Sequence, residues 1–440
     1  MPIYKYLLFI AGQIGIMSLA RFFFQWIIKF ASTPEVAGDP TSPVLFIGLG
    51  GMLLAFRLFD GVTDPLAGTL SDRWVRAGRQ RRTLLWFSFI APAIGLVLCF
   101  LPAHSMPGAL RWTIAGLGMF IFFVGYTFYA IPYWSLVDDY AGDNLHTRRM
   151  LSNLLGAGML LATAIGFVVS GILVEKFGYA NSAIIFGAFA LVLMPLPIFA
   201  KPKNARAAAI DPTPAPSLWK GMGMALRHRR FLALIALFAG SQMSFTIMTS
   251  AAPFISEDLL GGSEKDVGRI LGPLLGSGIL CFVFVPAMSR KLGWERGMLL
   301  GSLGLAPVYL CSGILGNAVI GSPILTAGLL FSIGGPMIAL LLGMEGEGVV
   351  DCALERGGSD TVSIYWGVFN FIVKGLNGLA IFIASSLSDL RSHLNSADPG
   401  AGTIAVRWMS FVAGGCLLVG VIAYFLIKRG ATPPKAATTT

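Results

Sequence analysis

The ionisable residues inside long apolar stretches are the part of this sequence whose chemistry most needs an explanation. In the stretch FRLFDGVTDPLAGTL, Arg57, Asp60 and Asp64 follow one another at helical spacing, so a helix would project all three from one face. The hydroxyl of Thr63 lies beside the two carboxylates. Oxygen ligands of this kind suit a small hard cation, and repulsion between two close carboxylates favours the binding of a proton. The pattern therefore predicts a site for Na⁺ or H⁺.

The same acidic face also has a purely structural interpretation. Arg57 and Asp60 could neutralise each other as an ion pair, with Asp64 close to the membrane surface. We favour the cation site, because the structural interpretation gives the second carboxylate no role.

Two further cations interrupt other apolar stretches. Lys374 lies near the middle of SIYWGVFNFIVKGLNGLAIF, where an ammonium group needs an anionic neighbour, and the two aspartates are the expected partners. A lysine that extends to the membrane surface is the alternative, which its central position disfavours. Arg21, in the segment LARFFFQW, either lines a central cavity or reaches the outer lipid headgroups, and the residues alone favour neither.

The elements that would position these residues are membrane-spanning helices. Hydrophobic residues make up 55% of the chain and charged residues only 12%, and the mean hydropathy is +0.75. Soluble domains carry about a quarter charged residues, and apolar runs of roughly twenty residues are long enough to cross a bilayer as helices. The runs predict an all-α membrane protein with twelve transmembrane helices, near residues 5–30, 43–67, 83–102, 112–136, 150–174, 180–200, 231–254, 267–288, 298–315, 322–343, 363–386 and 406–427.

These helices divide into two groups of six. The predicted plan is an N-terminal six-helix bundle over 1–200, a cytoplasmic central loop over 201–230, a C-terminal six-helix bundle over 231–428 and a disordered cytoplasmic tail over 429–440. A weak repeat, GTLSDRWVRAGRQRR and PAMSRKLGWER, follows the second helix of each group and indicates pseudo-symmetric halves. Lys and Arg concentrate in the loops on one side, which predicts a multi-pass protein of the cell membrane with both termini cytoplasmic.

The net charge of +10 bears on the possible partners. The basic residues lie in short loops between apolar runs and are not gathered on one soluble face, so we expect no nucleic-acid partner. No Ser-His-Asp grouping or metal-ligand spacing of the five cysteines is visible, so we expect neither an enzyme nor a resident cofactor. The expected partners are a small organic solute, a coupling ion and membrane lipid, with the monomer as the functional unit.

One segment after the second predicted helix resembles a known signature. Gly68, Asp72 and Arg73 fit G-x-x-x-D-R, which is followed here by further basic residues, as in the cytoplasmic loop between helices 2 and 3 of the major facilitator superfamily. This resemblance implies two six-helix halves with the substrate site between them. It also implies a gate at this loop, where Asp72 and Arg73 would hold the cytoplasmic face closed.

More specific motifs make the chain similar to the glycoside–pentoside–hexuronide:cation symporter family over nearly its whole length. DGVTDP fits the family's D-x-x-x-D-P, IPYW fits I-P-[FY]-W, and GVFNFIVK fits a segment that ends in a functional lysine. The resemblance, together with the charge pattern, indicates residues for cation binding (Asp60, Asp64, Thr63, Thr127), for coupling (Lys374, Arg57) and for gating (Gly68, Asp72, Arg73, Asp351). It indicates a solute cavity with the wall residues Trp134, Tyr133, Arg21, Ala130 and Asn370.

The positions at which this family reads sugar hydroxyls are apolar in this chain. Ala130 is one of them, and the others fall near Ile14 and Leu154. A sugar hydroxyl facing an apolar wall loses its hydrogen bond, which costs about 1–3 kcal/mol. Trp134, beside the kink expected at Pro132, is suited either to stacking on a solute or to the aromatic belt at the membrane surface.

The expected function is therefore cation-coupled symport of a small organic solute, which is a sugar or glycoside by family. An amphiphilic or lipid-like solute and a proton-driven exporter are the alternatives. A non-transporting membrane receptor or assembly factor is less favoured, because such a protein would have no use for costly charges inside the membrane.

Overall fold

The computed structural model describes residues 2–32, 44–102, 105–142, 144–201, 218–316, 321–356 and 362–429. Within these ranges every regular element is a helix, and each of the twelve predicted spans overlaps one or more of these helices, so the all-α membrane architecture is confirmed. We call residues 2–201 the first half and residues 218–429 the second half. The helices of the first half are α1 (Ile3–Ala31), α3 (Val44–Arg76), η1 (Arg81–Leu84), α4 (Leu85–Ser88), α5 (Ile90–Cys99), α6 (Gly108–Ala141), α7 (Leu145–Ala164), η2 (Ile165–Val169), α8 (Ser170–Leu193) and η3 (Leu196–Ala200). Those of the second half are α9 (Leu218–Leu226), α10 (Arg229–Phe254), η4 (Ile255–Leu259), α11 (Asp266–Phe282), α12 (Val285–Ser312), α13 (Pro323–Arg356), α14 (Val362–Ala397) and α15 (Thr403–Arg429).

The described helices have the lengths and composition of membrane spans. Eight stretches are long and apolar enough to cross a bilayer, or up to nine if the bent pair of α11 and α12, which meet at 92°, counts as one span. One of the eight, over 146–200, breaks at Gly178 (φ 75°, ψ 173°), where the chain turns back, so this stretch supplies two of the predicted spans. The chain is therefore a multi-pass membrane protein.

Several helices continue well past their predicted ends. α3 runs beyond residue 67 to Arg76, and α13 beyond residue 343 to Arg356. Hydropathy marks only the part of a helix that lies in lipid, whereas the backbone hydrogen bonds continue into water. α3 stops where Gly78 takes a positive φ of 78° and its N–H bonds to the carbonyl of Val75. The predicted central loop also contains a short helix, α9.

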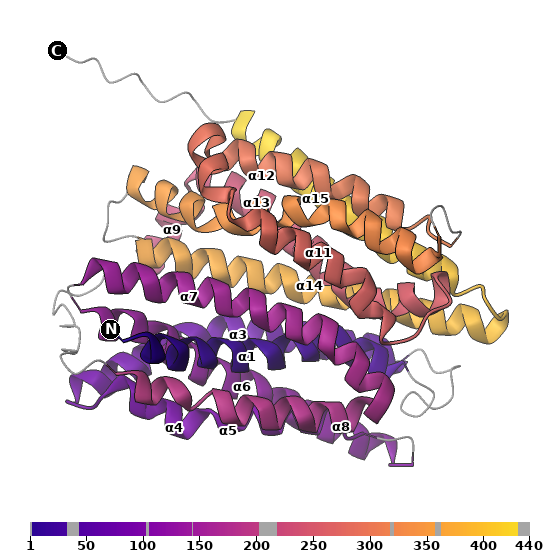
Figure 1. Cartoon of the computed structure of the whole chain (residues 1–440), viewed down its shortest axis with the longest axis horizontal. Helices are drawn as coiled ribbons and strands as arrows, with labels where there is room; N and C mark the ends of the chain where they lie inside the picture. Colours follow the sequence, from indigo (N-terminus) through magenta and orange to yellow (C-terminus); the bar gives the residue numbers. More distant parts are fainter. Residues whose placement is uncertain are drawn as a thin grey trace.

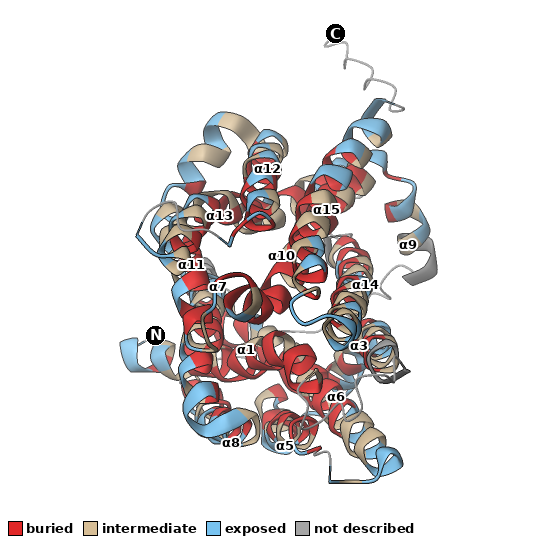
Figure 2. Cartoon of the chain, turned by 90° about the vertical axis from the view of Figure 1, so that its right-hand side faces the viewer, coloured by how far each residue is buried: buried red, intermediate tan, exposed pale blue. Residues whose placement is uncertain are grey.

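The helices lie side by side in two groups, with the first half below and the second half above in the orientation of Figure 1. The start of α1 and the end of α15 lie at the same end of the molecule (Figure 1), which we call the terminal end; the opposite end is the distal end. Seen end-on, α1 and α10 occupy the middle of the molecule and are largely buried (Figure 2), whereas the outer faces of the peripheral helices are exposed. The two halves meet where α3 packs against α14 and α1 packs against α10.

Candidate cation site and solute cavity

The close approach of α3 and α14 depends on two glycines. A Cβ atom at Gly378 of α14 would lie 2.9 Å from the Cβ of Arg57, and a Cβ atom at Gly61 of α3 would lie 3.1 Å from the ring of Phe371. A side chain at Gly378 would push the two helices apart, and a side chain at Gly61 would require the Phe371 ring to move. The glycines therefore bring α14 onto the face of α3 that holds the aspartates.

The predicted charges meet at this crossing. The Nζ of Lys374 lies 2.5 Å from the Oδ2 of Asp64 and 3.0 Å from the Oδ2 of Asp60. Arg57 reaches the same Asp60 oxygen through Nη1 at 3.1 Å, and its guanidinium lies 4.2 Å from the centre of the Phe24 ring. The Asp60 side chain is fully buried. Residues separated by more than three hundred positions thus form one ion-pair network between the halves.

The two predicted threonines lie at this network but differ in what they contact. Thr127 of α6 donates its hydroxyl to the Oδ1 of Asp60 at 2.6 Å and lies 3.5 Å from the Oδ1 of Asp64. Thr63 instead donates to the backbone carbonyl of Asp60 at 3.1 Å. The structure therefore places Thr127 on the carboxylates, whereas the Thr63 hydroxyl is directed to the main chain of its own helix.

The charge balance of the network limits what it can bind. Two carboxylates face one ammonium and one guanidinium, so the four groups are formally neutral. Among the described residues, no group of three or more His, Cys, Asp or Glu side chains is placed to hold a metal ion. The carboxylate pair is chemically suited to Na⁺, and hydroxyl, main-chain or water oxygens would have to complete the coordination shell. The ammonium of Lys374 contacts both carboxylates.

A cavity of about 270 Å³ lies between the halves near this network. Its walls come from α1, α7, α10, α11, α13 and α14, and most of them are apolar. Arg21 lines the cavity. This is the first of its two predicted positions, the other being at the outer lipid headgroups. The polar side chains on the wall are Arg21, Thr163, Gln242 and Glu345.

The other predicted wall residues lie elsewhere. Tyr133 and Ala130 are fully buried, and the Tyr133 hydroxyl donates to the carbonyl of Phe9 at 2.7 Å, so both pack inside the first half and do not line the cavity. Trp134 donates Nε1 to the Oε1 of Gln13 at 2.9 Å and does not line this cavity either. Asn370 is exposed and lies outside the cavity wall. A one-residue step along a helix turns a side chain by about 100°, so the motif alone does not show which residues face the cavity.

Glu345 is an ionisable wall residue that was not predicted from the sequence. The predicted helix ended at residue 343, which left Glu345 in a loop, whereas α13 continues to Arg356 and directs this carboxyl into the cavity. The signal was available, because the segment GMEGEGVVDCALER contains no proline to end the helix.

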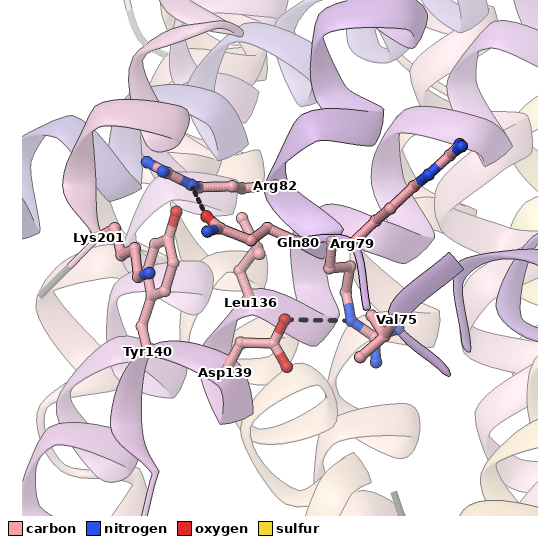
Figure 3. A pocket seen from close by; sticks show the side chains of 9 residues that line it. Val75, Arg79, Gln80, Arg82, Leu136, Asp139, Tyr140 and Lys201 are labelled. Carbon is pink, nitrogen blue, oxygen red and sulfur yellow. Dashed lines mark hydrogen bonds and ion pairs between the residues drawn. The ribbon is translucent and has the colours of Figure 1, made fainter. Parts of the chain in front are cut away.

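The predicted gate residues at the terminal end lie on α3 and not in a loop. Asp72 pairs with Arg81 at 2.9 Å. Arg81 also binds Asp139, which is labelled in Figure 3, at 3.2 Å. Gly68 and Arg73 lie on the same helix. All of these contacts stay within the first half, so the predicted latch between the halves is not formed in this conformation.

Asp351 belongs to an equivalent cluster in the second half. It accepts hydrogen bonds from Arg230 and from the indole of Trp294, both at 2.9 Å. Arg230 also binds Glu295 at 2.8 Å and Glu355 at 2.9 Å. Asp351 lies on α13 and not in the predicted loop before α14.

Ion pairs join the two halves at the distal end. Lys29 of α1 pairs with Glu257, and Glu175 of α8 lies 2.7 Å from the Nζ of Lys265. The hydrogen bond to Glu175 raises the pKa of Lys265 above its ordinary value. A Cβ atom at Gly171 would lie 2.3 Å from the carbonyl oxygen of Glu264, so the halves also touch through their backbones. Among the described residues, the ion pairs at the terminal end each join residues of one half, so this conformation is closed at the distal end.

Comparison with known proteins places this geometry in context. A family model described as MFS/sugar transport protein matches residues 44–428. An uncharacterized symporter of Bacillus subtilis (strain 168), YjmB, is 25% identical over 361 residues, which cover 80% of this chain and 75% of that protein. The sodium-dependent lysophosphatidylcholine symporter 1 of Xenopus tropicalis is 19% identical over 421 residues, which cover 85% of this chain and 79% of that protein. The fold is also that of an auto-inhibited POT family peptide transporter, with a TM-score of 0.72, 13% identity and 99% of both chains covered.

Proposed function

Because this chain belongs to the MFS/sugar transport protein family, we propose that it is a cation-coupled symporter that carries a small organic solute across the cell membrane. Symporters among its relatives support this proposal. The observation that carries it is the position of Lys374, whose ammonium lies between Asp60 and Asp64 on the other half of the molecule.

The proposed mechanism is competition between Lys374 and the coupling ion. Na⁺ or H⁺ arriving at Asp60 and Asp64 neutralises the carboxylates and releases Lys374, which weakens the link between α3 and α14. The two halves then rock about the midplane so that the solute cavity opens alternately to each side. Ion and solute share one coupling free energy, so each tightens the binding of the other by the same factor.

The proposed orientation has both termini in the cytoplasm, in agreement with the positive-inside distribution of Lys and Arg. The distal end then faces outward, and its ion pairs keep the outer side closed in this conformation. Asp72, Arg73 and Asp351 are proposed to act at the cytoplasmic side when the molecule opens outward. We propose that the monomer is the functional unit.

The first prediction concerns the ion. Na⁺ that binds the native state alone should stabilise the purified protein by about 2.7 kcal/mol at a concentration one hundred times its Kd, and Asp60→Asn should abolish this effect because it removes a carboxylate of the site. The measurement is thermal melting with NaCl against choline chloride, at pH values between 6 and 8. If the ion is H⁺, the wild-type protein should show no Na⁺ effect, but acid should stabilise it, and Asp60→Asn should remove that dependence.

Transport in vesicles supplies the decisive control. An imposed Na⁺ or H⁺ gradient should drive solute accumulation by the wild-type protein and not by the Asp60→Asn variant. Concentrative uptake by the variant contradicts the proposed coupling, and efflux driven by inward proton movement would identify an exporter.

An amphiphilic solute is the second candidate, because the cavity wall is mostly apolar and one relative is a lysophosphatidylcholine symporter. Melting screens against sugars and lysolipids, each with and without Na⁺, separate the two solute classes.

A further inference from the structure

The cavity between the halves is lined by one basic and one acidic side chain that the candidate cation site does not use. Arg21 reaches it from α1 in the first half, and Glu345 reaches it from α13 in the second half. Between them the wall is built mainly by apolar side chains of α10, α11 and α14, among them Phe238, Leu275 and Val373. A cavity with apolar walls and a few placed polar groups is the usual form of a small-molecule site.

Glu345 has no partner among the described residues. No described side chain donates a hydrogen bond to its carboxyl or forms an ion pair with it, although the charges elsewhere between the halves are paired. A carboxylate at an apolar wall is costly unless a cation or a hydrogen-bond donor reaches it. Within the described chain nothing supplies that donor, so a group from outside the protein is expected to do so.

Arg21 is held in place but is only partly used. Its Nε donates to the hydroxyl of Thr163 at 3.1 Å, and its guanidinium lies 5.7 Å from the ring centre of Phe167 and 5.9 Å from that of Phe245. The two Nη groups make no hydrogen bond or ion pair within the described part of the chain, and the Arg21 side chain lines the cavity. A guanidinium fixed in this way presents paired donors to an anionic group with little further loss of side-chain freedom.

We propose that this cavity selects a dipolar organic solute, whose anionic group binds Arg21, whose cationic group binds Glu345 and whose body is apolar. This inference rests on the proposed transport function and names its solute class. A neutral sugar would leave both charges without a counter-charge. Val373 lies on the cavity wall and directly precedes Lys374 in the sequence. A bound solute would therefore lie on the same helix as the lysine that the ion releases.

The test uses three probes on the purified wild-type protein. 6-Aminohexanoate carries both charges on an apolar chain, hexanoate only the anion and hexylamine only the cation. Each charge-assisted contact is expected to improve affinity about tenfold or more, so 6-aminohexanoate should bind at least that much more tightly than either single-charge probe. Equal affinity of the three probes, or tighter binding of a neutral hexose, overturns the proposal.

Two variants test which side chain binds each charged group of the solute. Glu345→Gln should remove the advantage of 6-aminohexanoate over hexanoate, and Arg21→Gln should remove its advantage over hexylamine. Glu347→Gln is the matched control, because Glu347 lies on the same helix, is exposed and binds Ser289 outside the cavity. The proposal fails if Glu345→Gln keeps the full preference. Where a variant does not fold, the comparison of probes on the wild-type protein still decides.

The same experiment separates this inference from the proposed function. If no probe binds while Na⁺ or acid stabilises the wild-type protein and not the Asp60→Asn variant, cation coupling stands and the dipolar solute is rejected. If neither ion nor probe has any effect, both proposals are rejected.

Discussion

At the scale of single residues, Lys374 acts as a tethered cation. It holds two carboxylates that repel each other, and Arg57 neutralises what remains of their charge. A buried pair of this kind adds little net stability, but removing one partner leaves an uncompensated charge. In the proposed mechanism, a mobile ion and this side chain compete for the same oxygens.

A second prediction follows for this network. Lys374→Ala should destabilise the protein by about 3–5 kcal/mol, because it leaves two carboxylates facing one guanidinium. The double variant Lys374→Ala with Asp64→Asn should recover part of that loss, since one carboxylate and Arg57 then balance. Melting of both proteins measures the effect, with Lys291→Ala as an exposed control. Strictly additive effects of the two substitutions would mean that the groups do not interact.

At the scale of elements, small residues decide how closely helices from different halves approach. Gly378 and Gly61 allow contact between α14 and α3 at the cation site, and Gly171 allows contact at the distal end. Extension of helices beyond the lipid is the other feature at this scale. It carries Asp72 and Asp351 into ion-pair clusters at the terminal end, each confined to one half.

A third prediction tests the helix crossing. Gly378→Val should destabilise the protein by about 1–3 kcal/mol, because a Cβ atom there meets the Arg57 side chain at 2.9 Å. Gly367→Ala lies on the same helix with nothing within 4 Å and should be neutral or slightly stabilising. Thermal melting compares the two. Equal stability of both variants would show that α3 and α14 do not pack this closely.

At the scale of the whole molecule, the ion pairs that join the halves are unevenly distributed. The pairs that join the halves away from the cation site lie at the distal end, whereas those at the terminal end stay within one half in the described chain. The molecule is therefore held in a conformation closed at the distal end. The pair of Glu175 and Lys265 is exposed, and an exposed ion pair contributes only about 0–1 kcal/mol, which is suitable for a contact that must break in every cycle.

A fourth prediction concerns this closure. The combined substitution Lys29→Gln and Glu175→Gln should shift the equilibrium toward a distally open form by about fivefold, since the two ion pairs that join the halves at the distal end are lost. Spin labels at the exposed residues Lys176 and Arg269 report the opening as a longer distance between the halves. Asp398→Asn, at an exposed residue outside these pairs, is the control. An unchanged distance distribution would remove these pairs from the gate.

The sequence by itself determined the features that depend on local pattern. Apolar runs predicted the membrane helices, and the spacing of Arg57, Asp60 and Asp64 predicted one charged face, because both follow from the helical period and the high cost of charge in lipid. The same cost predicted that Lys374 needs an anionic partner. These inferences required no knowledge of which helices are neighbours.

Only the tertiary structure decided which helix faces line the cavity. Tyr133 and Ala130, predicted on the wall, pack inside the first half, while Glu345, predicted in a loop, reaches the cavity. The physical reason is that lipid-facing, packed and cavity-facing surfaces of a membrane helix are all apolar. Hydropathy therefore does not predict how a helix is rotated about its own axis. That rotation is set by contacts between helices that are distant in the sequence.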